Sequence, residues 1–198
     1  MSNSNEDIEL WRKLQAGEES ALHELMRLFY NDLYRYGLKL IQRDELCKDC
    51  IQTIFCTLWE KRGNLPEVKA VKSYLLSALR NEAIRQLNKD RKLHLTLSGQ
   101  NDLFPIQFTI EELLIQEQTQ AHQKLVLFKT INELSKRQRE VIYLHFYEDM
   151  EAAQIAEIMS LQIQSVYNLL SESIKVLRNK LASNPQWLTF LPLVMALI

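Results

Sequence analysis

Apolar residues recur every three or four positions along most of the chain, which is the spacing of one face of an α-helix. In the C-terminal half this pattern forms two segments separated by the short break Ser160–Gln162. The apolar positions are Ile155, Ala156 and Met159 in the first segment and Val166, Leu170, Ile174, Leu177 and Leu181 in the second. Two helices joined by a turn of about three or four residues are typical of a helix-turn-helix, whose second helix can enter the major groove of DNA.

The second of these helices carries polar side chains opposite its apolar stripe. These candidate DNA contacts are Gln164, Ser165, Tyr167, Asn168, Ser171 and Lys175. Amide and hydroxyl groups can pair with base edges, and a lysine can bind phosphate. The periodicity alone also fits a helical hairpin with a solvated polar face, because such patterns are common in helical proteins.

The same periodicity predicts four helices in the N-terminal half. They extend from Asn5 to Gly17, from about Glu19 to Leu40, from about Asp44 to Gly63, and from about Ala70 to Lys92. Four helices of these lengths can bury one core. We therefore expect a first domain over residues 1–92.

Residues 93–109 lose the periodicity and contain Pro105 and a polar run, so they predict a linker. A second domain follows over residues 110–183, and residues 184–198 form an apolar C-terminal tail. The chain has only four Gly and four Pro among 198 residues, which favours helix. We expect an all-α protein with two small helical domains.

Two capping boxes predict where helices of the second domain begin. Thr109 is followed by Glu112, and Ser135 is followed by Gln138. In such a box each side chain binds the backbone N–H of the other residue at the start of a helix. The pair Asn184–Pro185 is expected to end the last helix.

The cysteines indicate a reducing compartment. Cys47, Cys50 and Cys56 are an odd set with no secretory signal ahead of them, so we expect a cytoplasmic protein. Cys47 and Cys50 have the spacing of a metal or redox pair, but they lie in an amphipathic helix without a second pair. We interpret them as ordinary helix residues. The apolar tail is shorter than the ~20 residues that span a bilayer, so we expect no membrane-embedded segment.

No arrangement of residues indicates an enzyme. The histidines are scattered, and the sequence has neither a glycine-rich phosphate loop nor a nucleophile elbow. The four histidines are His23, His94, His122 and His145. We therefore expect no catalytic residues, no metal and no cofactor.

A basic segment lies in the fourth predicted helix, although the formal net charge of the chain is only -1. Its candidate DNA contacts are Lys72, Tyr74, Arg80, Asn81, Arg85 and Lys89. Cations with an aromatic ring and an amide suit separated DNA strands, because the cations bind phosphate while the ring stacks on a base. An ordinary basic solvent face is the alternative. The low net charge suits a protein that leaves most of its DNA affinity to a partner.

Two sets of motifs resemble bacterial sigma factors. Region 4 of that family is similar to LSKRQREV, QIAEIM, a turn, and QSVYNLL followed by LRNKL. Region 2 is similar to DELCKDCIQTIFCTLWEKRGNL and VKSYLLSALRNEAIRQLNKDRK. The short form without further domains resembles the extracytoplasmic-function (ECF) group. Tyr74 and the pair Tyr167–Asn168 look like the variety common in Bacteroidetes.

The resemblance implies a sigma factor that binds core RNA polymerase and directs initiation at promoter DNA. It implies that the fourth helix, with the loop Gly63–Ala70, recognises and melts the minus-ten element, while the helix-turn-helix reads the minus-thirty-five element. The third helix would bind a coiled coil of the β′ subunit through Asp49, Gln52, Thr53, Phe55 and Trp59. By analogy alone, a membrane-bound anti-sigma factor is a further partner.

The chain departs from the family pattern at a few positions. Region 4 usually has glycine where this chain has Asp149 and Ser160, and a basic residue where it has Tyr167 and Leu169. Asp149 can still cap a helix, and Ser160 is tolerated in a tight turn if it avoids a left-handed conformation. The missing cations favour weak binding of the free chain to DNA. The alternatives are a helix-turn-helix regulator that acts without polymerase and a helical interaction protein.

Overall fold

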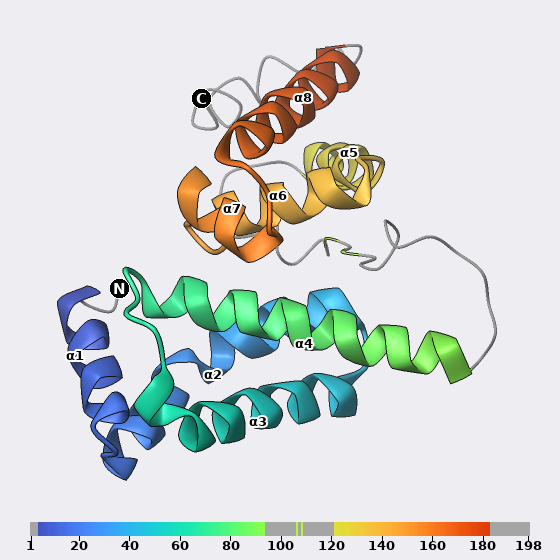
Figure 1. Ribbon diagram of the computed structural model, residues 1–198. Coiled ribbons are helices and arrows are strands. Elements are labelled where there is room, and N and C mark those ends of the chain that lie inside the picture. The colour runs from blue at the N-terminus through green and yellow to red at the C-terminus, as the bar shows by residue number, and fades with distance from the viewer. Residues whose placement is uncertain (1–3, 94–105, 107, 109–120, 183–198) are drawn as a thin grey trace. The chain divides into compact units, whose positions relative to one another are not determined.

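The computed structural model describes residues 4–93, 106, 108 and 121–182. Every regular element in these ranges is a helix, which confirms the all-α prediction (Figure 1). The chain forms two compact units, and the boundary along the sequence lies between Pro105 and Ile106. Among the described helices, none has the length and apolar character needed to cross a membrane.

The first unit consists of four α-helices and a short 3-10 turn. They are α1 (Ser4–Gln15), α2 (Glu19–Ile41), α3 (Asp44–Glu60), η1 (Arg62–Asn64) and α4 (Val71–Leu93). The helix α2 packs against α1, α3 and α4 (Figure 1). Fully buried leucine and isoleucine side chains from these helices form the core, including Leu14, Leu25, Leu33, Ile51, Leu75 and Leu79. The helices begin and end within a few residues of the positions that the apolar periodicity predicts.

A glycine sets the close packing of α2 against α3 and α4. A Cβ atom on Gly37 would lie 2.7 Å from the Sγ of Cys47 and 3.2 Å from the Cδ2 of Leu79. Cys47 and Cys50 are both fully buried, and burial raises their pKa values to about 12 and about 11. Both thiols are therefore protonated at neutral pH and act as small packing groups rather than as nucleophiles.

The second unit contains α5 (Ala121–Asn132), α6 (Lys136–Phe146), α7 (Ala152–Met159) and α8 (Ile163–Ala182). The predicted capping box at the start of α6 is present. Gln138 donates its backbone N–H to the Ser135 hydroxyl, and the Gln138 side chain accepts the backbone N–H of Ser135 at 3.0 Å. The helix α8 packs on α5 and α6 through its apolar stripe. The box predicted at Thr109 and the stop at Asn184–Pro185 lie outside the described residues.

The second unit begins earlier in the sequence than residue 110. Ile106 and Phe108 are buried in it, although they fall in the predicted linker. Asn132 accepts the backbone N–H of Phe108 at 3.1 Å, and the Phe108 ring contacts Tyr147 at a centroid distance of 5.4 Å. A linker and an extended segment that packs on a domain can have the same sequence pattern, namely isolated apolar residues without helical periodicity. The sequence alone therefore could not show that Ile106 and Phe108 are buried.

The turn between α7 and α8 contains a left-handed residue, a conformation that glycine adopts most easily. Ser160 has φ +54, in the left-handed region. The N–H of Leu161 bonds the carbonyl of Ala156 at 2.8 Å, and the N–H of Ser160 bonds that of Glu157 at 3.3 Å. This is a Schellman C-cap with Ser160 at the position that usually holds glycine. The condition for tolerating Ser160, that it avoid the left-handed region, is not met, because closing the helix end requires that conformation.

Asp149, the other position where the family usually has glycine, also has φ +54. It does not occupy the N-cap position of α7, which is Glu151. The N–H of Glu151 is accepted by the side chain of Gln154 at 2.9 Å. The two positions where the family usually has glycine are therefore both left-handed, and in this chain they are occupied by Asp149 and Ser160.

Replacing Ser160 with glycine should stabilise the second unit. A left-handed conformation costs an L-residue about 1–2 kcal/mol, and glycine loses roughly 0.5–1 kcal/mol through its freer unfolded state. We expect Ser160→Gly to raise the free energy of unfolding by about 0.5–1 kcal/mol, measured by urea denaturation. Ser171→Gly is the matched control, because it lies within α8 and should lower stability by a similar amount. A loss of stability in Ser160→Gly would contradict this role of the turn.

Candidate nucleic-acid and polymerase interfaces

The polar face of α8 is exposed, as its periodicity predicts. Val166, Leu170 and Leu177 are buried on the opposite side of the helix. Of the candidate DNA contacts on α8, Ser165 is half-buried, and the exposed ones are Gln164, Tyr167, Asn168, Ser171 and Lys175. The structure therefore brings all of these predicted residues to one side of a single helix, next to the helix-turn-helix break.

Two amides on this face are hydrogen bonded to each other. The Nε2 of Gln164 donates to the Oδ1 of Asn168 at 3.1 Å, across one helical turn. The pair restricts the Asn168 side chain while leaving its Nδ2 as a donor and the Oε1 of Gln164 as an acceptor. A fixed amide pair of this kind can make the bidentate contact that identifies an adenine in the major groove.

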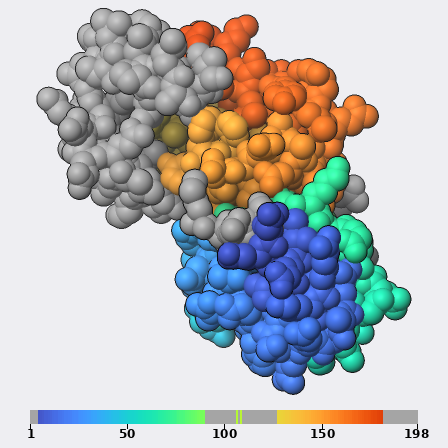
Figure 2. All heavy atoms as spheres, turned by 90° about the vertical axis from the view of Figure 1, so that its left-hand side faces the viewer, coloured from blue at the N-terminus to red at the C-terminus, as the bar shows by residue number. Residues whose placement is uncertain are grey.

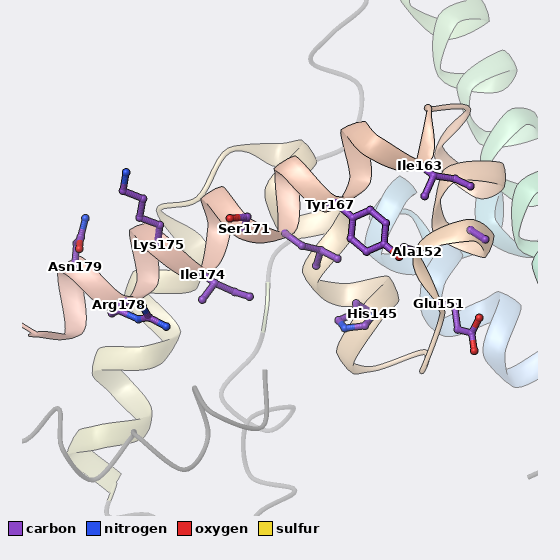
Figure 3. A pocket seen from close by; sticks show the side chains of 12 residues that line it. His145, Glu151, Ala152, Ile163, Tyr167, Ser171, Ile174, Lys175, Arg178 and Asn179 are labelled. Carbon is purple, nitrogen blue, oxygen red and sulfur yellow. The ribbon is translucent and has the colours of Figure 1, made fainter. Parts of the chain in front are cut away.

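An elongated groove runs along the flank of α8, with a volume of about 1010 Å³. Figure 3 shows Ile163, Tyr167, Ile174 and Arg178 along the helix. The opposite wall is formed by residues at the end of α6 and the start of α7, which are His145, Glu151, Ala152 and Ala153. Ile163 and Tyr167 are 49% and 55% exposed, so large apolar groups face solvent here.

In α4, two of the predicted cations are already ion-paired. Lys72 lies 3.0 Å from Asp32 of α2, and Arg85 binds both carboxylate oxygens of Glu82 at 2.8 and 2.6 Å. The bonds from Arg85 lower the pKa of Glu82, which therefore stays ionised. Asn81 is exposed. These pairs reduce the net positive charge that α4 offers to DNA.

The remaining candidates of α4 differ in exposure. Arg85 and Lys89 are exposed, whereas Lys72, Tyr74 and Arg80 are half-buried. Burial raises the pKa of the Tyr74 hydroxyl. The predicted residues follow the same helix but do not form one uniformly exposed patch.

The helix α1 holds the loop before α4, a role that the sequence did not indicate. Trp11 is fully buried and donates its indole N–H to the carbonyl of Pro66 at 2.9 Å, while its ring meets Tyr74 edge to face at 4.9 Å. Gln15 donates to the carbonyl of Leu65 at 2.9 Å. Figure 2 shows α1 beside the segment that follows α3. In the sequence, the indole of Trp11 and the amide of Gln15 were the only features that could have suggested a contact with this loop.

The predicted polymerase contacts on α3 fall into three groups by exposure. Asp49 and Gln52 are exposed, and Thr53 and Trp59 are half-buried. Phe55 is only 4% exposed and belongs to the core, so we remove it from this surface. Its position in the helix directs it inward together with Ile51 and Leu58. Periodicity alone did not separate it from the flanking Trp59.

Trp59 is fixed at the end of α3 by a neighbouring arginine. The Arg62 guanidinium lies over its ring at 4.3 Å from the centroid and donates to the Trp59 carbonyl at 2.7 Å. Cys56 is exposed, one turn after Gln52. It lies on the same face as Asp49 and Gln52 and had not been expected there.

In the part of the chain that the structure describes, no group of three or more His, Cys, Asp and Glu residues is arranged to hold a metal ion. Of the two histidines with described side chains, His145 contacts the carbonyl of Met150 at 2.9 Å and His23 that of Glu19 at 3.1 Å. Both have local roles at helix ends or turns.

Comparison with known proteins matches two families to this chain. Sigma-70 region 2 matches residues 25–93, and sigma-70 region 4 matches residues 124–177. The ECF RNA polymerase sigma factor SigM of Bacillus subtilis (strain 168) is 27% identical over 165 residues, which covers 80% of this chain and 96% of that protein. The RNA polymerase sigma-F factor of Bacillus licheniformis is 22% identical over 126 residues, covering 63% of this chain and 49% of that protein.

Solved structures share the fold. CnrH, in complex with the cytosolic domain of CnrY, has a TM-score of 0.59 and 16% identity, covering 90% of this chain and 98% of that one. The sigma factor RpoE, in complex with the anti-sigma factor NepR from Bartonella quintana, has a TM-score of 0.56 and 20% identity, covering 82% of this chain and 97% of that one.

The two matched regions occur in the order that the motifs predicted. Region 2 covers most of the first unit, and region 4 covers α6 and α7 with parts of α5 and α8. The resemblance seen in the sequence is thereby confirmed at the level of the family. The chain belongs to the sigma-70 family, as an ECF-type sigma factor that directs promoter-specific transcription initiation with RNA polymerase and has no enzymatic activity of its own.

Proposed function

We propose that the two units divide the work of promoter recognition. The helix α8 reads the minus-thirty-five element, α4 and the loop before it recognise and melt the minus-ten element, and the exposed face of α3 binds the β′ subunit of core polymerase. The observation that carries this proposal is the exposed polar face of α8 directly opposite its buried stripe. The region 2 and region 4 matches support the division.

Asn168 should specify one base pair of the upstream element. Its amide lies on the exposed face of α8 and is ordered by Gln164. Asn168→Ala should cost about 1–3 kcal/mol at one position and relax the base preference there. The measurement is polymerase binding to a set of promoters with single base changes.

Asn179→Ala is the control for this experiment. It removes the same group from an exposed position about three turns further along α8. It should leave the base preference unchanged. An Asn168→Ala variant that weakens all promoters equally would contradict base reading and would indicate a backbone contact instead.

The role of α4 in strand opening rests on its cations. Replacing both Arg80 and Arg85 with alanine should leave polymerase binding intact but reduce opening of the minus-ten element, measured by permanganate reactivity of unpaired thymines. A pre-melted template should restore much of the activity, because it supplies the unpaired bases.

Glu82→Gln provides a matched test in the opposite direction. It removes the carboxylate that binds Arg85, so strand opening should be equal to or greater than that of the parent. If the double alanine variant opens duplex promoters as well as the parent does, the melting role of α4 is wrong.

The surface for polymerase is the exposed side of α3. It consists of Asp49, Gln52, Thr53 and Trp59, without the buried Phe55. Thr53 donates its hydroxyl to the carbonyl of Asp49 at 2.8 Å, so it offers a methyl group and an acceptor rather than a free donor. Asp49, Gln52 and Trp59 therefore supply the charged, polar and aromatic contacts.

An anti-sigma factor is a further proposed partner. RpoE is found with the anti-sigma factor NepR, and CnrH is found with the cytosolic domain of CnrY. We propose that a membrane-bound regulator of this kind binds the present chain in the cytoplasm. The similarity of Tyr74 and Tyr167–Asn168 to sigma factors of Bacteroidetes stays a prediction, and the relatives named above include proteins of Bacillus.

A further inference from the structure

The groove along α8 overlaps the proposed DNA-reading face. Tyr167, Ser171 and Lys175 line the groove and are also candidate DNA contacts. Figure 3 shows the side chains of these residues along the same helix as Ile163 and Ile174. Any segment that fills the groove would therefore compete with DNA.

The lining suits an apolar, uncharged occupant. Ile163 and Ile174 of α8 and the alanines of the opposite wall give the lining apolar groups, and Ile163 and Tyr167 are about half exposed. Lys175 and Arg178 carry the positive charges of the lining, and their long side chains can cover an apolar occupant while the cationic heads stay in water. A strongly acidic occupant is disfavoured, because its negative charges would be buried next to the carboxylate of Glu151.

The chain itself contains a segment with this character directly after α8. The stretch Trp187–Ile198 has no charged residue and carries Trp187, Leu188, Phe190, Leu191, Leu193, Val194, Leu197 and Ile198. It lies outside the described residues and outside the region 4 match, which ends at residue 177. So many apolar groups need a surface that removes them from water.

The lengths are compatible. The groove follows α8 from Ile163 to Arg178, about 22 Å along the helix axis. Twelve residues reach about 18 Å as a helix and about 40 Å when extended. The connection from Ala182 to Trp187 spans up to about 16 Å, enough to reverse direction beside a helix about 10 Å wide.

We propose that the segment Trp187–Ile198 folds back into the groove along α8 and covers its DNA-reading flank in the free protein. The consequence for DNA rests on the function proposed above. The docking itself does not. Free sigma factor would then bind promoter DNA only after this segment leaves the groove.

A thiol-protection experiment on the full-length chain tests the docking without DNA. Cys56→Ser removes the exposed thiol, and the buried Cys47 and Cys50 are unreactive. In this background the thiol introduced by Ser171→Cys reports on the groove. The thiol introduced by Glu172→Cys is the control, because Glu172 is exposed on α8 but does not line the groove.

The tail is changed without altering its length or charge, by Trp187→Ser, Leu191→Ser and Val194→Ser together. If the segment occupies the groove about nine-tenths of the time, these changes should speed labelling at Ser171→Cys about tenfold and leave Glu172→Cys unchanged. Equal labelling at Ser171→Cys with either tail overturns the proposal. Protection that grows with protein concentration overturns it as well, because the occupant is then a second copy.

The DNA arm uses the same tail variant with the native residues of α8. Its affinity for promoter duplex, measured on the free protein, should rise about tenfold because the occluded fraction is removed. Thiol protection without any change in affinity overturns the competition with DNA. That result also excludes Tyr167 and Lys175 from DNA reading, so it identifies a failure of the proposed function rather than of the docking.

Discussion

Free in solution, the chain is expected to bind promoter duplex only weakly, with a Kd of about 10⁻⁴ to 10⁻⁶ M at physiological salt. The net charge is -1, and part of the cationic surface is neutralised within the fold. Lys72 is paired with Asp32, Arg85 with Glu82, and Lys180 with Glu133. These pairs lower the number of cations that are available to release counterions from the DNA backbone.

Adding core polymerase should make the binding specific and at least about 10³-fold tighter, and strongly dependent on salt. The measurement is fluorescence anisotropy of a labelled promoter duplex at several salt concentrations, with and without core polymerase. A duplex of scrambled sequence is the control, and core polymerase should increase the affinity for it much less. Tight, sequence-specific binding by the free chain would instead favour a regulator that acts without polymerase.

Trp11→Ala should be among the most destabilising single changes in the first unit, lowering its free energy of unfolding by about 3–5 kcal/mol. The indole is fully buried, and its removal leaves a cavity beside Tyr74. It also removes the 2.9 Å hydrogen bond to the carbonyl of Pro66, which then keeps the longer one from Gln15 at 3.4 Å. Urea denaturation followed by circular dichroism measures the loss. Arg12→Ala, an exposed change on the same helix, should have an effect within about 0.5 kcal/mol.

Trp11→Phe separates packing from loop positioning. It keeps an aromatic ring against Tyr74 but removes the hydrogen bond to Pro66, so it should cost about 1–3 kcal/mol. Because the loop before α4 is then less firmly held, strand opening should fall more than polymerase binding. If Trp11→Phe opens promoters like the parent, α1 contributes stability only and does not position the loop.

The sequence predicts the helices well because burial in this fold follows a regular period. The segments expected from about Glu19, Asp44 and Ala70 correspond to α2, α3 and α4. The capping box of Ser135 and Gln138 is equally local, since both partners lie within four residues. Such features depend on neighbouring residues, so they can be read without knowing the tertiary structure.

Features that depend on contacts distant in the sequence were not predictable. Trp11 and Gln15 hold Pro66 and Leu65, more than forty-five positions away in the chain, and the sequence around α1 does not identify these partners. The docking of Phe108 on Asn132 is similarly non-local.

Single residues were hard to predict for a different reason. Phe55 lies close to the edge of the buried face of α3, where a rotation of a few tens of degrees decides between core and surface. The positive φ of Ser160 follows from the geometry of the helix end, which overrides the preference of serine for negative φ. The family pattern of glycines carried the correct information at that position.

Run-off transcription with core polymerase tests the central claim most directly. Purified core enzyme is given a library of genomic fragments from the source organism, with and without the chain, and the 5′ ends of the transcripts are mapped. We predict a set of discrete start sites that appear only with the chain and share two upstream sequence elements. If adding the chain produces no start sites beyond those of core enzyme alone, its role as a sigma factor is contradicted.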